Sequence, residues 1–318
     1  MKKLTIVVPI FNELDCLPEL IDRLDLVMLN HLAQFLVEIV LVDDGSTDGS
    51  REFIQEVIER QNHYNLVVLS RNFGHQRAVL AGLHKASGDA IIIIDADLQD
   101  PPEVIPNLVK AWENGSDVVY AVRQKRTGEN YFKKISARYF YRILNWLSET
   151  RIPPDSGDFR LVDRYVLDVV KNMKEQSLFL RGIFSWVGFR QTAIPYDRDP
   201  RFAGKSKYPL RKMFGLAVDA ILGFSERPLR LVVRFGVIAT AGSASLLFYF
   251  LLSKLINNGY RAPGWLSIIS VVLFLGSVQI LLIGLIGIYI SRIYRETKAR
   301  PIYIVDDRVG KKQFEENS

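Results

Sequence analysis

Two long stretches without a charged residue, Phe235–Ser253 and Ala262–Ser291, most constrain what this chain can fold into. A helix needs about 20 apolar residues to cross the hydrocarbon core of a bilayer, and both stretches are of that order or longer. A helical hairpin inside a soluble core is the alternative, but neither stretch has the polar face that such helices carry. We therefore expect two transmembrane helices, over residues 230–256 and 264–294.

The distribution of basic residues predicts how this hairpin is oriented. Four basic residues lie in the ten positions after Ile290, and arginines also precede the first stretch, whereas the loop between the stretches contains only Lys254 and Arg261. Because cytoplasmic segments carry the excess of Lys and Arg, we expect both termini in the cytoplasm, including a tail over residues 295–318. The single cysteine, Cys16, excludes an internal disulfide and fits a reducing compartment.

Residues 1–195 alternate apolar runs with amphipathic segments, which predicts an α/β domain on a mainly parallel sheet. In such open sheets, ligands bind beyond the carboxyl ends of the strands. The expected strands are Thr5–Ile10, Val37–Val42, Leu66–Ser70, Ala90–Ile94 and Asp117–Val122, and the expected helices are Leu17–Asn30, Gly49–Gln61, Gln76–Ala86 and Glu103–Asn114.

Four consecutive isoleucines, residues 91–94, lead directly into a polar cluster that contains Asp95, Asp97 and Gln99. Packed carboxylates repel one another unless a cation lies between them, and hard oxygen ligands suit Mg²⁺ or Mn²⁺. A divalent ion with open positions can hold a diphosphate. Solvated acids in a capped turn are the alternative, but the buried strand and the amide oxygen of Gln99 favour a metal site.

Two other strands also end in polar segments, at Pro9–Glu13 and Asp43–Asp48, so three polar clusters converge on one edge of the sheet. Asp43 can accept hydrogen bonds from a base or ribose, and Ser46 or Thr47 is expected to cap the following helix. The chain has neither a G-x-G-x-x-G motif after a strand nor a P-loop motif, which disfavours dinucleotide oxidoreductases and P-loop NTPases.

Further candidates come from the histidines and from one acidic segment. The four histidines, His31, His63, His75 and His84, lack zinc-site spacing and are expected to be structural or surface residues. The segment Asp155–Leu161 is expected to form a turn at the mouth of the site. Within it, Asp158 is a candidate positioning group or general base, and a helix N-terminal cap is the alternative.

Two basic stretches, residues 123–142 and 198–212, bracket these motifs, and each has apolar residues at helical spacing. Basic amphipathic helices close to membrane spans are typical of interfacial helices among anionic headgroups, and we expect such a segment over residues 196–229. A solvated basic face is the alternative, and nucleic-acid binding is disfavoured so close to two spans. Arg123, Arg201 and Lys207 are the leading candidates for phosphate binding.

Five motifs occur here in an order that resembles one family: residues 8–13, 43–48, 95–103, 157–160 and 204–208. The chain resembles the polyisoprenyl-phosphate glycosyltransferases of glycosyltransferase family 2, which include dolichol-phosphate mannose synthases and bacterial undecaprenyl-phosphate glucosyltransferases. The resemblance covers nearly the whole chain. It implies a GT-A fold for residues 1–195 and a multi-pass protein of the inner (plasma) membrane with a cytoplasmic catalytic domain. It also implies a homo-oligomer, a tetramer.

The resemblance also implies roles for individual residues. Asp97 and Asp158 would be catalytic, and Asp95, Asp97 and Gln99 would bind Mg²⁺ or Mn²⁺. The nucleotide sugar would contact Pro9, Phe11, Glu13, Asp43, Asp44, Asp95 and Ala96. The phosphates of donor and acceptor would contact Arg123, Arg138, Arg201 and Lys207.

The implied reaction is inverting transfer of glucose from UDP-glucose to membrane-bound undecaprenyl phosphate, for glycosylation of the cell envelope. A GDP-mannose-dependent mannosyltransferase is the first alternative, and a processive polysaccharide synthase or a non-enzymatic membrane scaffold is less favoured. The segment Pro301–Val305 is expected to add a strand to a neighbouring subunit's sheet, or to be frayed.

Overall fold

The computed structural model of the chain describes residues 1–123, 156–173, 175, 179–197 and 265–310, together with 229–230, 232–238, 241–242, 245, 248 and 252. The basic stretch after Arg123, the expected interfacial segment from residue 198 to 228 and most of the first expected span lie outside these residues. The chain divides into two compact units, one built on a sheet and including residues 300–310, the other containing residues 215–299.

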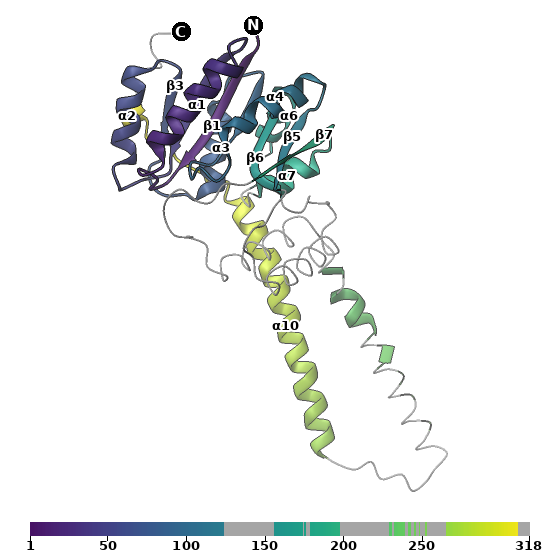
Figure 1. Ribbon diagram of the computed structural model, residues 1–318. Coiled ribbons are helices and arrows are strands. Elements are labelled where there is room, and N and C mark those ends of the chain that lie inside the picture. Colours follow the sequence, from purple (N-terminus) through teal and green to yellow (C-terminus); the bar gives the residue numbers. More distant parts are fainter. Residues whose placement is uncertain are drawn as a thin grey trace. The chain divides into compact units, whose positions relative to one another are not determined.

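The first unit is organised around a seven-stranded sheet with strand order β3-β2-β1-β4-β6-β5-β7 (Figure 1). Its strands are β1 (Lys3–Ile10), β2 (Leu36–Asp43), β3 (Tyr64–Val68), β4 (Ala90–Ile93), β5 (Val118–Arg123), β6 (Ser156–Asp163) and β7 (Gln191–Tyr196). Only β6 runs antiparallel to its neighbours, so the prediction of a mainly parallel sheet is confirmed. The pairing of Ile93 with Arg160 brings the start of β6 to the carboxyl end of β4.

Helices cover both faces of this sheet, which explains why its strands are nearly continuous apolar runs. In β1, Ile6 and Val8 pack in the same core cluster as Leu20, whereas Val7 faces the opposite side, against Gly82. The first face carries α1 (Leu17–His31), α2 (Ser50–Arg60), the short 3-10 helix η1 (Pro102–Val104) and α4 (Ile105–Glu113). The second face carries α3 (His75–Lys85), α6 (Arg164–Lys171) and α7 (Leu180–Trp186).

The segment from Asp155 onward differs from its prediction, because residues 156–163 form strand β6 and not a turn. The alternation explains the difference: Phe159 and Leu161 point into the core cluster, while Arg160 points to the other face and lies over the ring of Phe184 in α7. A helix N-terminal cap is present nearby, but it is Asp163, whose carboxylate accepts a hydrogen bond from the backbone N–H of Tyr165.

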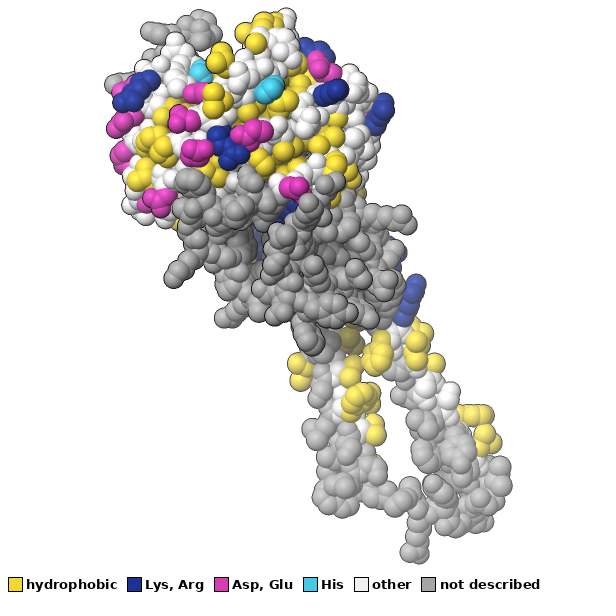
Figure 2. Space-filling view, viewed as in Figure 1, with side chains coloured by type: hydrophobic (Ala, Val, Ile, Leu, Met, Phe, Trp, Pro, Cys, Tyr) yellow, Lys and Arg dark blue, Asp and Glu magenta, His cyan; other side chains and the backbone are white. Residues whose placement is uncertain are grey.

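The second unit contains α10 (Trp265–Thr297), which matches the second expected span. Within the described part of the chain, Phe274–Thr297 is the one stretch of helix long and apolar enough to cross a membrane, with a mean hydropathy of 2.1. Its large apolar side chains are exposed, including Phe274, Ile280 and Ile283, and Figure 2 shows apolar side chains along this unit. The two-helix hairpin remains a prediction.

The residues after Arg300 return to the sheet of their own chain. The backbone N–H of Ser70 donates to the carbonyl of Ile304 over 2.9 Å, and that of Asp306 donates to the carbonyl of Val68 over 2.8 Å. Leu69 and Val305 form an antiparallel bridge between these bonds, ahead of the short helix α11 (Asp307–Gly310). Residues 304–306 are therefore paired with their own chain, and they cover the end of the edge strand β3.

Candidate active site

The loops that follow β1 and β2 are hydrogen-bonded to each other. The backbone N–H of Asn12 donates to the Ser46 hydroxyl over 3.0 Å, and the backbone N–H of Thr47 donates to the Asn12 side-chain oxygen over 2.8 Å. The expectation that Ser46 or Thr47 caps the next helix is therefore wrong. Helix α2 begins at Ser50 after Gly49, which has a φ of 95° and no side chain to cap with, because the Ser46 hydroxyl is used between the loops.

Asp43, at the end of β2, is fully buried and builds the turn that follows it. Its two carboxylate oxygens accept hydrogen bonds from the backbone N–H of Ser46 over 2.8 Å and from Arg51 Nε over 2.7 Å. Both oxygens are used within the turn and the side chain has no exposed surface, so contact with a ligand would require the turn to move. Of the other expected nucleotide contacts, Pro9 is buried in β1, and Phe11 and Glu13 lie partly buried in the loop after it.

Asp44 ties the end of β2 to the segment that starts α3. Its carboxylate is buried and accepts hydrogen bonds from the backbone N–H groups of Phe73, over 2.7 Å, and of Gly74, over 2.9 Å. Gly74 has a φ of 96°, a conformation that glycine adopts without strain. Burial raises the pKa of Asp44 in spite of these two hydrogen bonds. Asp44 thereby fixes where the first residue of α3, His75, emerges.

His75, expected to be a structural or surface residue, lies between two of the predicted acidic residues. Its Nε2 is 3.5 Å from Asp95 Oδ1 and 3.3 Å from Asp158 Oδ2. Side chains two residues apart on a strand lie on the same face of the sheet. Asp95 therefore lies on the face of Ile91 and Ile93, and Asp158 lies on the face of Arg160. Helix α3 covers that same face. Burial alone would lower the pKa of His75, but the charge of Asp95 and the hydrogen bond to Asp158 raise it to about 9.

Asp158 is held chiefly by Arg181 from α7. Arg181 Nε donates to Asp158 Oδ1 over 2.8 Å and its terminal nitrogen donates to Oδ2 over 2.9 Å, with Gln76 Nε2 at 3.4 Å. Burial acts to raise the pKa of Asp158, but Arg181 and the hydrogen bond from His75 hold it well below its usual range. This carboxylate is therefore a poor proton acceptor at neutral pH, which favours a positioning role over that of a general base.

Asp95 and Asp97 carry the negative charge expected of a cation site. Burial raises the pKa of Asp95 to about 6; His75 opposes this, while the carboxylates of Asp158, Asp100 and Asp97 add to it. Asp95 Oδ1 is buried and accepts no hydrogen bond from the described residues. Asp97 shapes the turn, because its Oδ1 accepts from the backbone N–H of Gln99 over 3.2 Å, and Ala96 is buried.

These features fit a divalent ion, because a cation would relieve the repulsion that Asp95 experiences from the neighbouring carboxylates. Within the described residues, no group of three or more His, Cys, Asp or Glu is arranged to hold a metal ion. An ion at Asp95 and Asp97 would therefore need further oxygen ligands, which Gln99 and a diphosphate can supply.

Comparison with known protein families decides the family. A family model described as glycosyl transferase family 2 matches residues 5–170, which is more than half of the chain. The chain belongs to glycosyltransferase family 2. The sheet and its polar carboxyl edge accordingly form a GT-A-like α/β domain of this family.

Relatives of this family-2 glycosyltransferase match along nearly their whole length. An uncharacterized glycosyltransferase, YkcC, of Bacillus subtilis (strain 168) is 45% identical over 306 residues, which cover 96% of this chain and 94% of that protein. The prophage bactoprenol glucosyl transferase homolog of Escherichia coli (strain K12) is 39% identical, covering 95% and 98%. The bactoprenol glucosyl transferase of Shigella phage SfX is 39% identical, covering 96% and 99%.

A basic residue of this glycosyltransferase, Arg123, lies at the same edge as the acids, at the end of β5. The Tyr196 hydroxyl donates to Asp100 Oδ1, and Arg123 lies 4.0 Å from that oxygen and donates from Nε to the Tyr196 hydroxyl over 3.3 Å. Burial lowers the pKa of Arg123, but Tyr196 and Asp100 outweigh it and raise the pKa overall. The other predicted phosphate ligands, Arg138, Arg201 and Lys207, lie outside the described residues.

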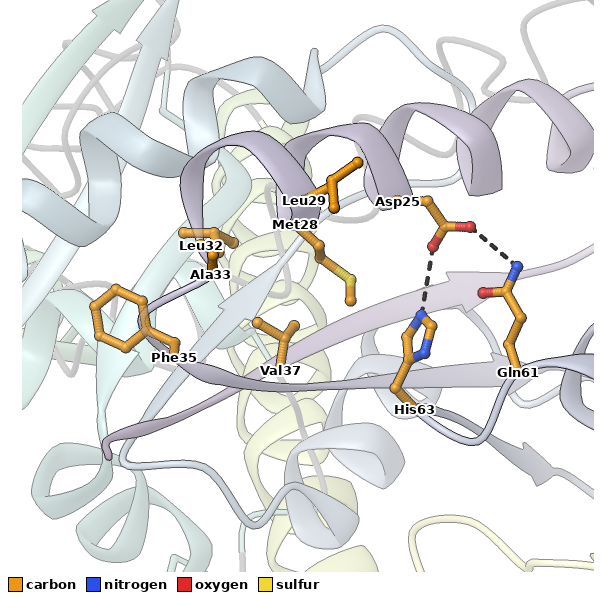
Figure 3. Close-up of a pocket in the computed structure, with 9 residues that line it drawn as sticks. All are labelled: Asp25, Met28, Leu29, Leu32, Ala33, Phe35, Val37, Gln61 and His63. Carbon is orange, nitrogen blue, oxygen red and sulfur yellow. Dashed lines mark hydrogen bonds and ion pairs between the residues drawn. The ribbon is translucent and has the colours of Figure 1, made fainter.

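A cavity of about 500 Å³ lies at the opposite edge of this glycosyltransferase's sheet, at the amino ends of β2 and β3. Met28 and Val37 line it, and Figure 3 shows Asp25 between Gln61 and His63 at one side. Asp25 accepts a hydrogen bond from Gln61 Nε2 over 3.0 Å and lies 3.4 Å from His63 Nε2. Because ligands of open α/β sheets bind at carboxyl ends, we assign the active site to the Asp95 edge and not to this cavity.

Proposed function

We propose that this family-2 glycosyltransferase transfers glucose from UDP-glucose to a membrane polyisoprenyl phosphate, undecaprenyl phosphate, with inversion at the anomeric carbon. The observation that carries the proposal is the carboxylate cluster of Asp95, Asp97 and Asp158 at the carboxyl edge of the sheet, next to Arg123. The diphosphate of a sugar nucleotide is negatively charged, and it could bind here through Arg123 and through a metal ion held by the carboxylates. Relatives named bactoprenol glucosyl transferase, similar along nearly the whole chain, support the acceptor and the sugar.

In this proposal the donor lies across the three strand ends. The nucleoside contacts Phe11, Glu13 and Asp43, with Pro9, Asp44 and Ala96 shaping the pocket around it. Asp95, Asp97 and Gln99 would hold Mg²⁺ or Mn²⁺, which when bound stabilises the negative charge that develops on the leaving diphosphate.

The acceptor phosphate does not need a strong general base. Phosphate monoesters have a second pKa of about 6, so the lipid phosphate is mostly dianionic near neutral pH and can attack directly. Asp158, kept ionised by Arg181, then orients the groups around the acceptor instead of removing a proton. Arg123, Arg138, Arg201 and Lys207 are the proposed phosphate contacts, and one displacement inverts the sugar.

Because a polyprenyl tail is insoluble in water, we propose that the two apolar C-terminal stretches hold the protein at the membrane where its acceptor lies. The domain of residues 1–195 would lie in the cytoplasm at the inner membrane, followed by the interfacial segment at 196–229. Spans at 230–256 and 264–294 would form a hairpin, with residues 295–318 returning to the cytoplasm. Because two spans enclose little space, we propose a homo-oligomer, a tetramer.

A donor panel tests this proposal. Membranes containing the protein are incubated with undecaprenyl phosphate, Mg²⁺ or Mn²⁺, and radiolabelled UDP-glucose, GDP-mannose or UDP-N-acetylhexosamine, and the lipid fraction is counted. We expect label from UDP-glucose, lost with a chelator and reduced by about 100-fold or more in Asp97→Asn. Asp22→Asn, at an exposed position on α1, is the matched control and should retain full transfer.

Each contrary result has a distinct meaning. Transfer of label from GDP-mannose, and from no other donor, would mean that the transferred sugar is mannose and not glucose. Growth of a sugar polymer without a lipid-linked monosaccharide would favour a processive synthase, and full activity of Asp97→Asn would refute the metal assignment.

A further inference from the structure

Two carboxylates of the site come from separate strands, and a single imidazole lies within reach of both. Asp95 follows β4, Asp158 belongs to β6, and His75 Nε2 is 3.5 Å and 3.3 Å from their nearest oxygens. The His75 side chain is 32% exposed, so it faces the open edge of the sheet and not the core. No motif of the chain marks this position.

Hydrogen bonds fix the backbone and side chains on both sides of His75. On one side, Asp44 holds the backbone N–H groups of Phe73 and Gly74. On the other side, Gln76 contacts Asp158 and accepts a hydrogen bond from the backbone N–H of Leu180 over 3.0 Å, at the start of α7. The ring of His75 therefore has a position set by β2, β6 and α7 together.

Satisfying Asp158 does not require His75. Arg181 already donates to both oxygens of Asp158, at 2.8 and 2.9 Å, which are the usual lengths of strong charge-assisted hydrogen bonds. The contacts of His75 are longer and are divided between two strand ends. The imidazole therefore lies between the two carboxylates, where it offsets the repulsion between their charges.

We propose that His75 is a positioning residue of the transfer reaction. It holds Asp95 beside Asp158, so that the donor diphosphate and the acceptor phosphate are bound next to each other in the orientation that transfer requires. This inference rests on the proposed function, in which Asp95 belongs to the donor side and Asp158 to the acceptor side. Loss of the Nε2–H donor leaves two carboxylates facing each other, and their repulsion separates the two halves of the site. The binding of the donor alone changes little, whereas the reaction between the two substrates slows.

A matched pair of substitutions tests the proposal. His75→Gln keeps an N–H donor at a similar distance from the backbone, and His75→Phe keeps a ring of similar size without a donor. We expect His75→Phe to lower kcat by about 10- to 100-fold, the range for loss of a hydrogen bond to a charged group, with KM for UDP-glucose changed less than about threefold. We expect His75→Gln to retain kcat within about fivefold of the wild type.

Two controls separate positioning from general damage. His31→Phe, at an exposed position at the end of α1, should leave kcat unchanged, and each His75 variant is assayed at a temperature at which circular dichroism shows it to be folded. In protein with ¹⁵N-labelled histidine, which has four histidines, one Nε2–H signal should be protected from solvent exchange and absent from His75→Gln.

Several results would overturn the inference. These are equal activity of His75→Phe and the wild type, equal losses in both His75 variants, or a freely exchanging His75 signal. An inactive wild type with every donor would instead refute the proposed function itself, so the two failures can be told apart.

Discussion

Replacement of Asp158 by Asn tests the central ion pair of the site. Asn has nearly the same volume, but it removes the negative charge and places an amide N–H₂ where one carboxylate oxygen accepts from Arg181. One charge-assisted hydrogen bond is lost and the other is weakened, while the Arg181 guanidinium remains in place without its counterion.

The structure sets the size of this effect. Breaking a buried ion pair by removing one partner costs about 3–5 kcal/mol, but the Arg181 side chain is 32% exposed and can recover some hydration, whereas Asp158 is only 8% exposed. We therefore expect a loss of about 2–3 kcal/mol. At about 2–4 °C per kcal/mol for a domain of about 200 residues, Tm should fall by about 4–12 °C.

Thermal unfolding of the detergent-solubilised protein, followed by near-ultraviolet circular dichroism, measures this change. Asp168→Asn is the matched control, because Asp168 pairs with Arg164 within one helix and its side chain is 56% exposed, so its Tm should shift by less than about 2 °C. The double variant with Arg181→Gln should lose less than the sum of the two single variants. Strictly additive losses, or an Asp158→Asn protein as stable as the control, would refute the assigned ion pair.

Three further predictions concern stability. The pKa of Asp158 is depressed in the folded protein, so its contribution is fully present at neutral pH and is lost as pH falls below about 4; the Tm difference between wild type and Asp158→Asn should therefore shrink between pH 7 and pH 3, and a constant difference would contradict this. Gly82→Ala should lower Tm by about 3–8 °C, because its Cβ would lie 2.3 Å from Val7 Cγ1, and an unchanged Tm would mean that the helix and sheet separate easily. Arg23→Gln breaks a bidentate pair with Glu103, whose side chain is 55% exposed, and thermal unfolding should show a shift of less than about 3 °C.

The first half of the sheet could be predicted from sequence, because each of its strands is a local apolar run bounded by turn residues. The predicted strand Ala90–Ile94 and the observed β4 differ by one residue, and the predicted helix Leu17–Asn30 and α1 also differ by one. Both faces of these strands are covered by helices, so burial leaves a strong local signal. The convergence of polar groups at the carboxyl edge followed from the parallel sheet alone.

Strand β6 and the place of His75 depend on contacts between distant residues, which leave a weak local signal. The four positions Asp158–Leu161 alternate between polar and apolar residues, which is the pattern of a strand. The segment was nevertheless predicted to be a turn, because it also contains Asp155 and Gly157. The pairing of His75 with Asp158 joins residues 83 positions apart and requires the antiparallel register of β6 beside β4. One clue was available: the helix that begins at His75 follows strand β3, so its first residue lies at the carboxyl edge, where ligands of such sheets bind.

The pairing of the tail with β3 has a consequence for how the protein is made. His84 and the Tyr303 hydroxyl, 2.6 Å apart, join residues separated by 219 positions, and the backbone bonds of Ile304 and Asp306 lie beside them. The ribosome releases this segment after every element of the sheet, so the end of β3 at Val68 stays open until residues 304–306 have been made. A chain that ended at Thr297 would leave the end of β3 at Val68 uncovered, and an open strand edge pairs readily with other molecules. We therefore expect a chain without residues 304–306 to aggregate more readily during synthesis than the full chain.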